Sequence, residues 1–210
     1  MPQLIKVRPT KIELIKLRRR LSLASRIQKI VKDRLSILMM EFLQIARETA
    51  EARKNLIDGF SKTYKTLSIA AGYQGYIALE KELRATERDL EITTSSRNIA
   101  GVRVPSLELK RPAERAMRGY NLVDTSSSLD QTAQLSEKCL DAIVALAELQ
   151  SSLELLGREI NRTKRIVNAL EYLIIPSLQM TIKYLYMKFE ERDREEKSRL
   201  KRVKVLLEQE

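Results

Sequence analysis

Two long stretches of the sequence place apolar residues at alternating spacings of three and four. The first begins after Pro9, where Thr10 and Glu13 have the spacing of a capping box, and it can continue to Gly72. A 3.5-residue period with Lys and Arg between the apolar positions is typical of the seam of a left-handed coiled coil. The predicted seam residues of this stretch are Leu14, Leu17, Leu21, Val31, Leu35, Leu38, Phe42, Ile45 and Leu56.

The second stretch follows the serines at 126–128, which can cap a helix, and it continues to the C-terminus. Its predicted seam consists of Leu153, Leu156, Ile160, Val167, Leu170, Ile174, Leu178 and Leu185. The steps from Leu170 to Ile174 and on to Leu178 are both four residues, and Pro176 lies at the same place. Proline removes a backbone donor and clashes with the preceding turn, so we expect a bend or local unwinding at Pro176.

The residues between these stretches have a different pattern. Residues 77–90 are compatible with a short helix, and residues on both sides of Asn98 and Gly101 alternate with period two, which predicts a β-hairpin over about 90–109. We therefore divide the chain into an N-terminal coiled-coil helix (10–72), a head (73–125) and a C-terminal coiled-coil helix (126–210). The expected fold is mainly α: a long antiparallel two-helix left-handed coiled coil with a small central head. We expect the hairpin to project from this head without apolar partners on the long helices.

Antiparallel pairing from the two termini also predicts a register. Partner residue numbers should sum to about 210, within two or three turns, so Leu14 should lie near Leu200 and Leu56 near Leu153. The two ends of the chain would then meet at one end of the coiled coil.

The composition argues against catalysis by this chain. Its 210 residues include no histidine, which excludes histidine triads and histidine metal ligands, and the single Cys139 cannot form an internal disulfide. Glu190 and Glu191 lie in a highly charged helix, where ion pairing with nearby arginines is the expected role. The sequence thus predicts no catalytic, cofactor-binding or metal site. It also shows no apolar run long enough to insert into a membrane, and one lone cysteine favours a reducing cytosolic setting.

Positive charge is concentrated at both ends of the chain. The formal net charge is +11, and the first 34 residues hold eleven basic side chains against Glu13 and Asp33. Such a nearly single-signed segment favours a partner surface of negative potential. We expect the contact to involve Lys11, Arg18, Arg19, Arg20, Arg194, Lys197, Arg199, Lys201 and Arg202, with the two groups side by side. Nucleic acid is the runner-up partner, although the first 34 residues contain no aromatic side chain for base stacking; a basic coiled-coil scaffold is a further alternative.

Several longer motifs resemble a known family. They are Arg8-Pro9-Thr10-Lys11 with Glu13-Leu14, Lys32-Asp33-Arg34 before Glu41-Phe42, the run from Glu159 to Glu171, Ile175-Pro176, Thr181 to Tyr184, Arg192 to Glu196, Arg199 to Arg202, and Asn98 to Pro105 in the hairpin. Together they strongly resemble the D subunit of the archaeal A-type and V-type rotary ATPases, and the resemblance covers nearly the whole chain.

The resemblance implies a non-catalytic central-stalk rotor subunit. Such a protein carries rotation between a hexamer of catalytic A and B subunits and a membrane ring, while ATP chemistry occurs on other chains. The implied partners are the A and B subunits, the small F subunit, and a funnel-shaped connecting subunit, called C or d, above the ring. The implied location is cytoplasmic and peripheral to the membrane, without nucleic acid or direct membrane insertion.

Overall fold

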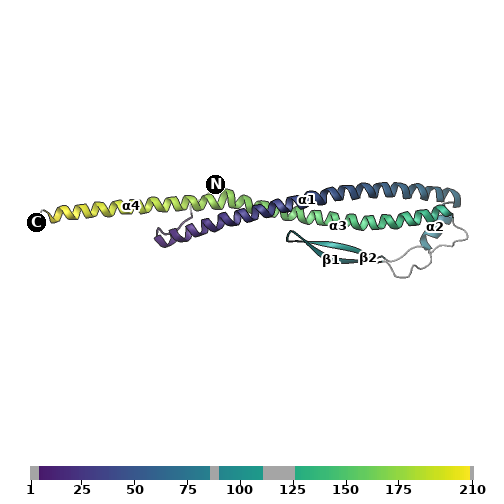
Figure 1. The fold of residues 1–210 in the computed structure, drawn as a ribbon, viewed down its shortest axis with the longest axis horizontal. Helices are drawn as coiled ribbons and strands as arrows, with labels where there is room; N and C mark the ends of the chain where they lie inside the picture. The colour runs from purple at the N-terminus through teal and green to yellow at the C-terminus, as the bar shows by residue number, and fades with distance from the viewer. Residues whose placement is uncertain (1–4, 86–89, 111–125, 209–210) are drawn as a thin grey trace. The chain divides into compact units, whose positions relative to one another are not determined.

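The structure is a computed structural model that describes residues 5–85, 90–110 and 126–208. Its elements in chain order are α1 (Lys11–Gln74), α2 (Tyr76–Ala85), β1 (Glu91–Ile99), β2 (Val102–Lys110), α3 (Ser127–Ala169), a π-helical turn (Leu170–Ile174) and α4 (Ile175–Leu207), as Figure 1 shows. The expected mainly helical fold with one β-hairpin is confirmed. The chain divides into two compact units, which we call the terminal unit (residues up to Ile37 and from Ile160 onward) and the middle unit (Leu38–Glu159).

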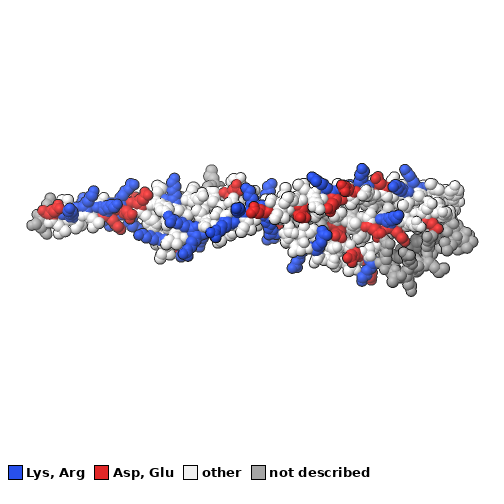
Figure 2. Space-filling view, viewed as in Figure 1, with Lys and Arg blue, Asp and Glu red and all other residues white. Residues whose placement is uncertain are grey.

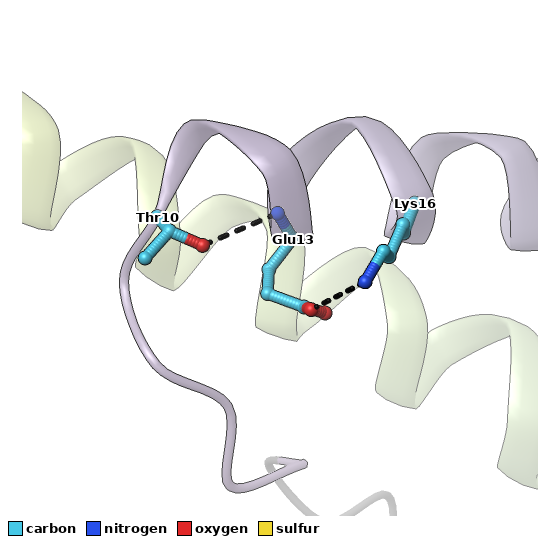
Figure 3. A network of polar contacts seen from close by, with 3 residues as sticks. All are labelled: Thr10, Glu13 and Lys16. Atoms are coloured by element: carbon cyan, nitrogen blue, oxygen red, sulfur yellow. Dashed lines mark hydrogen bonds and ion pairs between the residues drawn. The ribbon is translucent and has the colours of Figure 1, made fainter.

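The start of α1 is fixed by a side-chain cap. The Thr10 hydroxyl accepts a hydrogen bond from the Glu13 backbone N–H at 3.3 Å, which satisfies one of the free donors of the first turn. The Glu13 carboxylate accepts a hydrogen bond from the Lys16 ammonium at 3.0 Å, as Figure 3 shows. Helix α1 begins directly after this cap, at Lys11.

In the terminal unit, α1 and α4 run antiparallel (Figure 1). They share an apolar seam. Leu17 and Leu185 are 1% and 0% exposed at its centre. The buried cluster consists of Leu14, Leu17, Ala24, Leu178 and Leu185, with Leu21, Ile175, Ile182 and Phe189 packed against it. Burial of large aliphatic side chains, at roughly 1.5–3 kcal/mol each, is the main force that holds the two helices together.

The π-helical turn lies where the seam spacing changes. The buried residues Leu170 and Leu178 are eight positions apart, one more than the seven-residue repeat requires. The Ile175 N–H donates to the Leu170 carbonyl, five residues back, and Pro176 follows without an N–H of its own. The wider turn absorbs the additional residue. As a result, Ile174, which was expected in the seam, is 39% exposed.

Removing the additional residue should stabilise the terminal unit. Deleting Tyr172, which is 68% exposed, places the buried residues Leu170 and Leu178 seven positions apart. Adding Pro176→Ala restores the missing backbone N–H, so the helical hydrogen bonds can continue through this turn. We expect the free energy of unfolding to rise by about 1–3 kcal/mol, because proline costs about 3 kcal/mol in a helix interior. Thermal unfolding followed by circular dichroism measures the change. Pro176→Ala alone is the control, and a lower melting temperature for the double variant would contradict the register explanation.

In the middle unit, α1 and α3 also run antiparallel. A β-carbon at Gly157 would lie 3.6 Å from the Phe42 ring, and one at Gly59 would lie 3.3 Å from the Cys139 sulfur. The Thr63 hydroxyl also lies 3.5 Å from this sulfur. Residue numbers thus increase along α1 as they decrease along α3. Cys139 is buried, as expected for a small side chain inside a helix pair.

The numbers of facing residues sum to 198 for Gly59 with Cys139 and to 204 for Arg18 with Tyr186, so the register lies within about three helical turns of the predicted sum of 210. The individual pairs that were predicted are nevertheless shifted. Leu14 lies in the buried cluster that contains Leu185, whereas Leu200 is 69% exposed, so the predicted pair of Leu14 and Leu200 is wrong. Gly59 faces Cys139, so Leu56, three residues before Gly59, is level with a residue of α3 that precedes Leu153 by about three turns. The predicted pair of Leu56 and Leu153 is therefore also displaced. The physical reason is that a seven-residue repeat maps onto itself after a shift of seven residues, so the apolar pattern fixes the buried face and leaves the axial shift open.

At the end of α1, the chain reverses through Gly75. Its φ of 82° is in the left-handed region that glycine adopts without a steric cost, and its N–H donates to the Ala71 carbonyl at 3.0 Å. Helix α2 then packs back through Leu79, which is buried in a cluster with Ala70 and Leu129. One apolar side chain of α2 thus joins the end of α1 to the start of α3.

The hairpin has a regular antiparallel ladder from Glu91 opposite Lys110 to Ile99 opposite Val102. Ala100 and Gly101, with φ of 49° and 85°, form its two-residue loop. Positive φ at both central residues is the signature of a type I′ turn, whose twist matches that of the strands. The expected chain reversal is therefore confirmed, with Asn98 still paired to Arg103 in the ladder.

The hairpin does not project freely, because a polar contact ties it to α3. Val104 on β2 is 2% exposed, and the Leu107 N–H donates to the Glu148 carboxylate of α3 at 3.0 Å. Strand β1, by contrast, is exposed along nearly its whole length. The sequence pattern did not predict this contact. The Leu107 N–H is bonded by one carboxylate that is 41 residues away in the sequence, and no local repeat indicates such a bond.

Loss of the Glu148 carboxylate should loosen the hairpin. We expect Glu148→Ala to cost about 1–3 kcal/mol of local stability, because the partly buried Leu107 N–H loses its acceptor. Hydrogen exchange at the Leu107 amide should accelerate, while the ladder amides that face β1 change less. Glu154→Ala on the same helix is the control, because Glu154 pairs with the exposed Arg158 one turn along α3. Unchanged exchange at Leu107 would refute the role of this contact.

Candidate functional site

Acidic and thiol side chains are the groups with which this chain could bind a metal ion. No three acidic or thiol side chains converge on a possible metal position within 5–85, 90–110 and 126–208. In the same ranges, no helix has the combination of length and apolarity that a membrane span needs. The candidate functional surface is therefore the set of basic residues in the terminal unit.

Glu191 and Glu195 on α4 form ion pairs with neighbours on their own helix. The Lys188 ammonium donates to the Glu191 carboxylate at 2.7 Å, and this hydrogen bond lowers the pKa of the Glu191 carboxyl and raises the pKa of Lys188. Glu195 lies 3.7 Å from Arg199 on the next turn. These contacts are the exposed i,i+3 and i,i+4 pairs of a solvated helix surface.

All nine basic residues predicted as contacts are exposed. The Arg18 guanidinium lies over the Tyr186 ring at 5.1 Å, a cation–π contact that fixes the level of the α1 group along α4. Arg194 is eight residues beyond Tyr186, or about 12 Å of helix. In this antiparallel register Lys11 is about level with Arg194, whereas Arg18, Arg19 and Arg20 lie before the α4 group of basic residues.

The last part of α4 is exposed on all sides. Every residue from 190 to 208 is exposed, including the apolar Leu200, Val203 and Leu207. Basic and acidic side chains alternate along this segment in Figure 2, and Lys204 pairs with Glu208 at 3.6 Å. An isolated helix of this kind gains little from propensity alone, so a binding partner would supply its packing.

Over the first turns of α1, the charge is nearly single-signed. Figure 2 shows Lys and Arg gathered over this part of the terminal unit, with few acidic side chains among them. Sequence reasoning identified the basic residues but missed exposed apolar residues between them, such as Leu23 and Ile30, which are 59% and 66% exposed. These exposed apolar residues form a second apolar repeat along α1, on a different face from the seam. The seam repeat is longer and more regular, so it was the one that the sequence pattern indicated.

Comparison with known proteins identifies the family. The model of the ATP synthase D subunit family matches residues 13–205, almost the entire chain. The chain belongs to the ATP synthase D subunit family. The D subunit of the A-type ATP synthase of Pyrococcus furiosus is 42% identical over 212 residues, covering 99% of this chain and 98% of that protein. The protein of the same name from Methanopyrus kandleri is 38% identical over 202 residues, covering 96% and 87%.

A third relative, the D subunit of the A-type ATP synthase of Desulfurococcus, is 38% identical over 209 residues, covering 99% of this chain and 98% of the relative. The match to the D subunit family includes both long helices, the hairpin and the basic segments, so no major element of this chain lies outside it. The family resemblance drawn from the motifs is thus confirmed.

Proposed function

We propose that this member of the D subunit family is the central-stalk rotor of an A-type ATP synthase. In this role it is a non-catalytic axle that couples ATP hydrolysis or synthesis on a catalytic hexamer to ion translocation through rotation. The observation that carries the proposal is the family match over residues 13–205. It is supported by the long antiparallel helix pairs that make up most of the described structure.

The physics of a paired-helix shaft suits torque transmission. Two helices that share an apolar seam resist bending and twisting better than one, because deformation of either must disturb packed side chains on both. Leu17, Leu156 and Leu185, all at most 1% exposed, are such contacts. A rotor also has to present different faces to successive catalytic sites, so that each site is biased toward a different conformation.

The partners follow from this proposal. The exposed basic end of the terminal unit would face the hexamer of A and B subunits, and the F subunit and the connecting C or d subunit would bind elsewhere on the chain. The protein would then be cytoplasmic and peripheral to the membrane as part of the complex. Exposed arginines and lysines can make many weak contacts, which a rotating interface can form and release at each step.

Reconstitution tests the proposed function. Purified A and B subunits should assemble with the full-length chain and the F subunit, and a probe fixed to the chain should rotate in one direction when ATP is added. The same hexamer without the chain is the control. Failure of the chain to bind the hexamer would contradict the proposal. Tight, strongly salt-dependent binding of duplex DNA by the chain, with no effect on ATPase activity, would instead support the nucleic-acid alternative.

A further inference from the structure

Helix α1 has a second apolar face in the terminal unit. We call it the outer stripe, and it consists of Leu23, Ile27, Ile30 and Ile37, which are 59%, 40%, 66% and 47% exposed. Their spacings of four, three and seven residues place them on one face of the helix. The buried seam positions, such as Ala24, lie on a different face.

A helix in a two-stranded coiled coil needs only one apolar stripe. Single exposed apolar residues are common on protein surfaces, but four large aliphatic residues that repeat on one face form a continuous patch. A helix with two apolar faces is typical of a bundle in which it touches more than one neighbour. The outer stripe therefore has the geometry to accept one more helix.

The charges beside the outer stripe indicate the chemistry of that helix. The basic residues three or four positions from a stripe residue are Arg19, Arg20, Arg26 and Arg34, all arginines. Arg34 already interacts with another group of the chain, so we call Arg19, Arg20 and Arg26 the flanking arginines. The acidic neighbours at these spacings, Asp33 and Glu41, both lie at the Ile37 end. Arginine binds carboxylates through two parallel hydrogen bonds, a geometry that lysine cannot reproduce.

We propose that the outer stripe binds an acidic amphipathic helix of a partner protein. The apolar face of that helix packs on Leu23, Ile27 and Ile30, and its Asp or Glu carboxylates accept paired hydrogen bonds from the flanking arginines. This inference rests on the proposed function, which supplies the partner as a helical segment of the catalytic hexamer. Arg18 takes no part, because it packs over Tyr186.

The affinity of the full-length chain for a purified hexamer of A and B subunits tests the inference. Leu23→Ser with Ile30→Ser should raise Kd at least tenfold. Replacing the three flanking arginines by lysine keeps the charge and should raise Kd at least threefold, because the paired hydrogen bonds are lost. Ile57→Ser with Ile69→Ser is the matched control, since these residues are similarly exposed, at 59% and 53%, and lie in the middle unit. Circular dichroism checks that every variant remains helical.

A photocrosslinker at position 30 identifies the bound segment in the assembled complex. We expect a crosslink to a helix of the hexamer with Asp or Glu beside an apolar face, and much less crosslinking from position 25 on another face of α1. If the wild-type chain binds the hexamer and the stripe and arginine variants bind equally well, the inference is wrong and the proposed function stands. If the wild-type chain does not bind the hexamer, the proposed function itself fails. A crosslink to a segment without acidic residues, or to nucleic acid, also overturns the inference.

Discussion

Replacing Leu156 with alanine should lower the free energy of unfolding of the middle unit by about 2–5 kcal/mol. The Leu156 side chain is 0% exposed in the pair of α1 and α3, so its removal leaves a cavity between two rigid helices. Leu38, also 0% exposed, should behave similarly. Because domains of this kind are stabilised by only about 5–15 kcal/mol in total, either change removes a large fraction of the stability. Denaturant unfolding followed by circular dichroism measures the effect.

The control is Leu43→Ala in the part of α1 that belongs to the middle unit, where the leucine is 53% exposed. This change should cost much less, because the side chain already contacts water in the folded state. Equal costs for Leu156→Ala and Leu43→Ala would mean that the isolated chain in solution does not form the buried seam.

Removing residues 194–210 should abolish efficient coupling in the assembled complex while leaving the remaining chain folded. The described residues of this segment are all exposed, so the core of the terminal unit loses no contacts. If the segment is the end of the axle held by the hexamer, the yield of ion translocation per ATP should fall at least tenfold. Ion transport and ATP hydrolysis, measured together on the same vesicles, give this ratio.

Two full-length variants separate the apolar and charged contributions of this segment. Changing Leu200, Val203 and Leu207 to serine keeps all its charges, while reversing Arg194, Lys197 and Arg202 keeps its apolar residues. Exposed charges contribute about 0–1 kcal/mol per pair to stability, so neither variant should unfold the isolated chain. Normal coupling after the complete truncation would show that this end of α4 transmits no torque.

The sequence predicted the helices and the hairpin because each has a local period. The seam residues repeat every three or four positions, and none of the predicted seam residues in α1 is exposed. The axial register could not be predicted in the same way, since shifting one helix by a whole repeat preserves every apolar match. Only specific contacts, such as Arg18 over Tyr186, determine it.

The basic residues of the candidate surface were predicted from the sequence, whereas their levels along the helix pair depend on the register. Counting charges identified the basic residues at both ends of the chain, whereas the register placed Arg194 about 12 Å beyond the level of Arg18. The break near Pro176 was also visible in the spacing. Its form as a π-helical turn, with Ile175 donating to the Leu170 carbonyl, depends on which neighbouring residues the seam buries.

The burial of Cys139 makes this chain convenient for fluorescence work. It is the single cysteine of the sequence, it is 7% exposed, and its sulfur lies against Thr63 in the middle unit. A maleimide dye reacts with accessible thiolates, so the native thiol should label slowly in the folded protein. A cysteine introduced at an exposed position would then take up the dye selectively, and distance or rotation probes can be attached without first replacing a residue of the core.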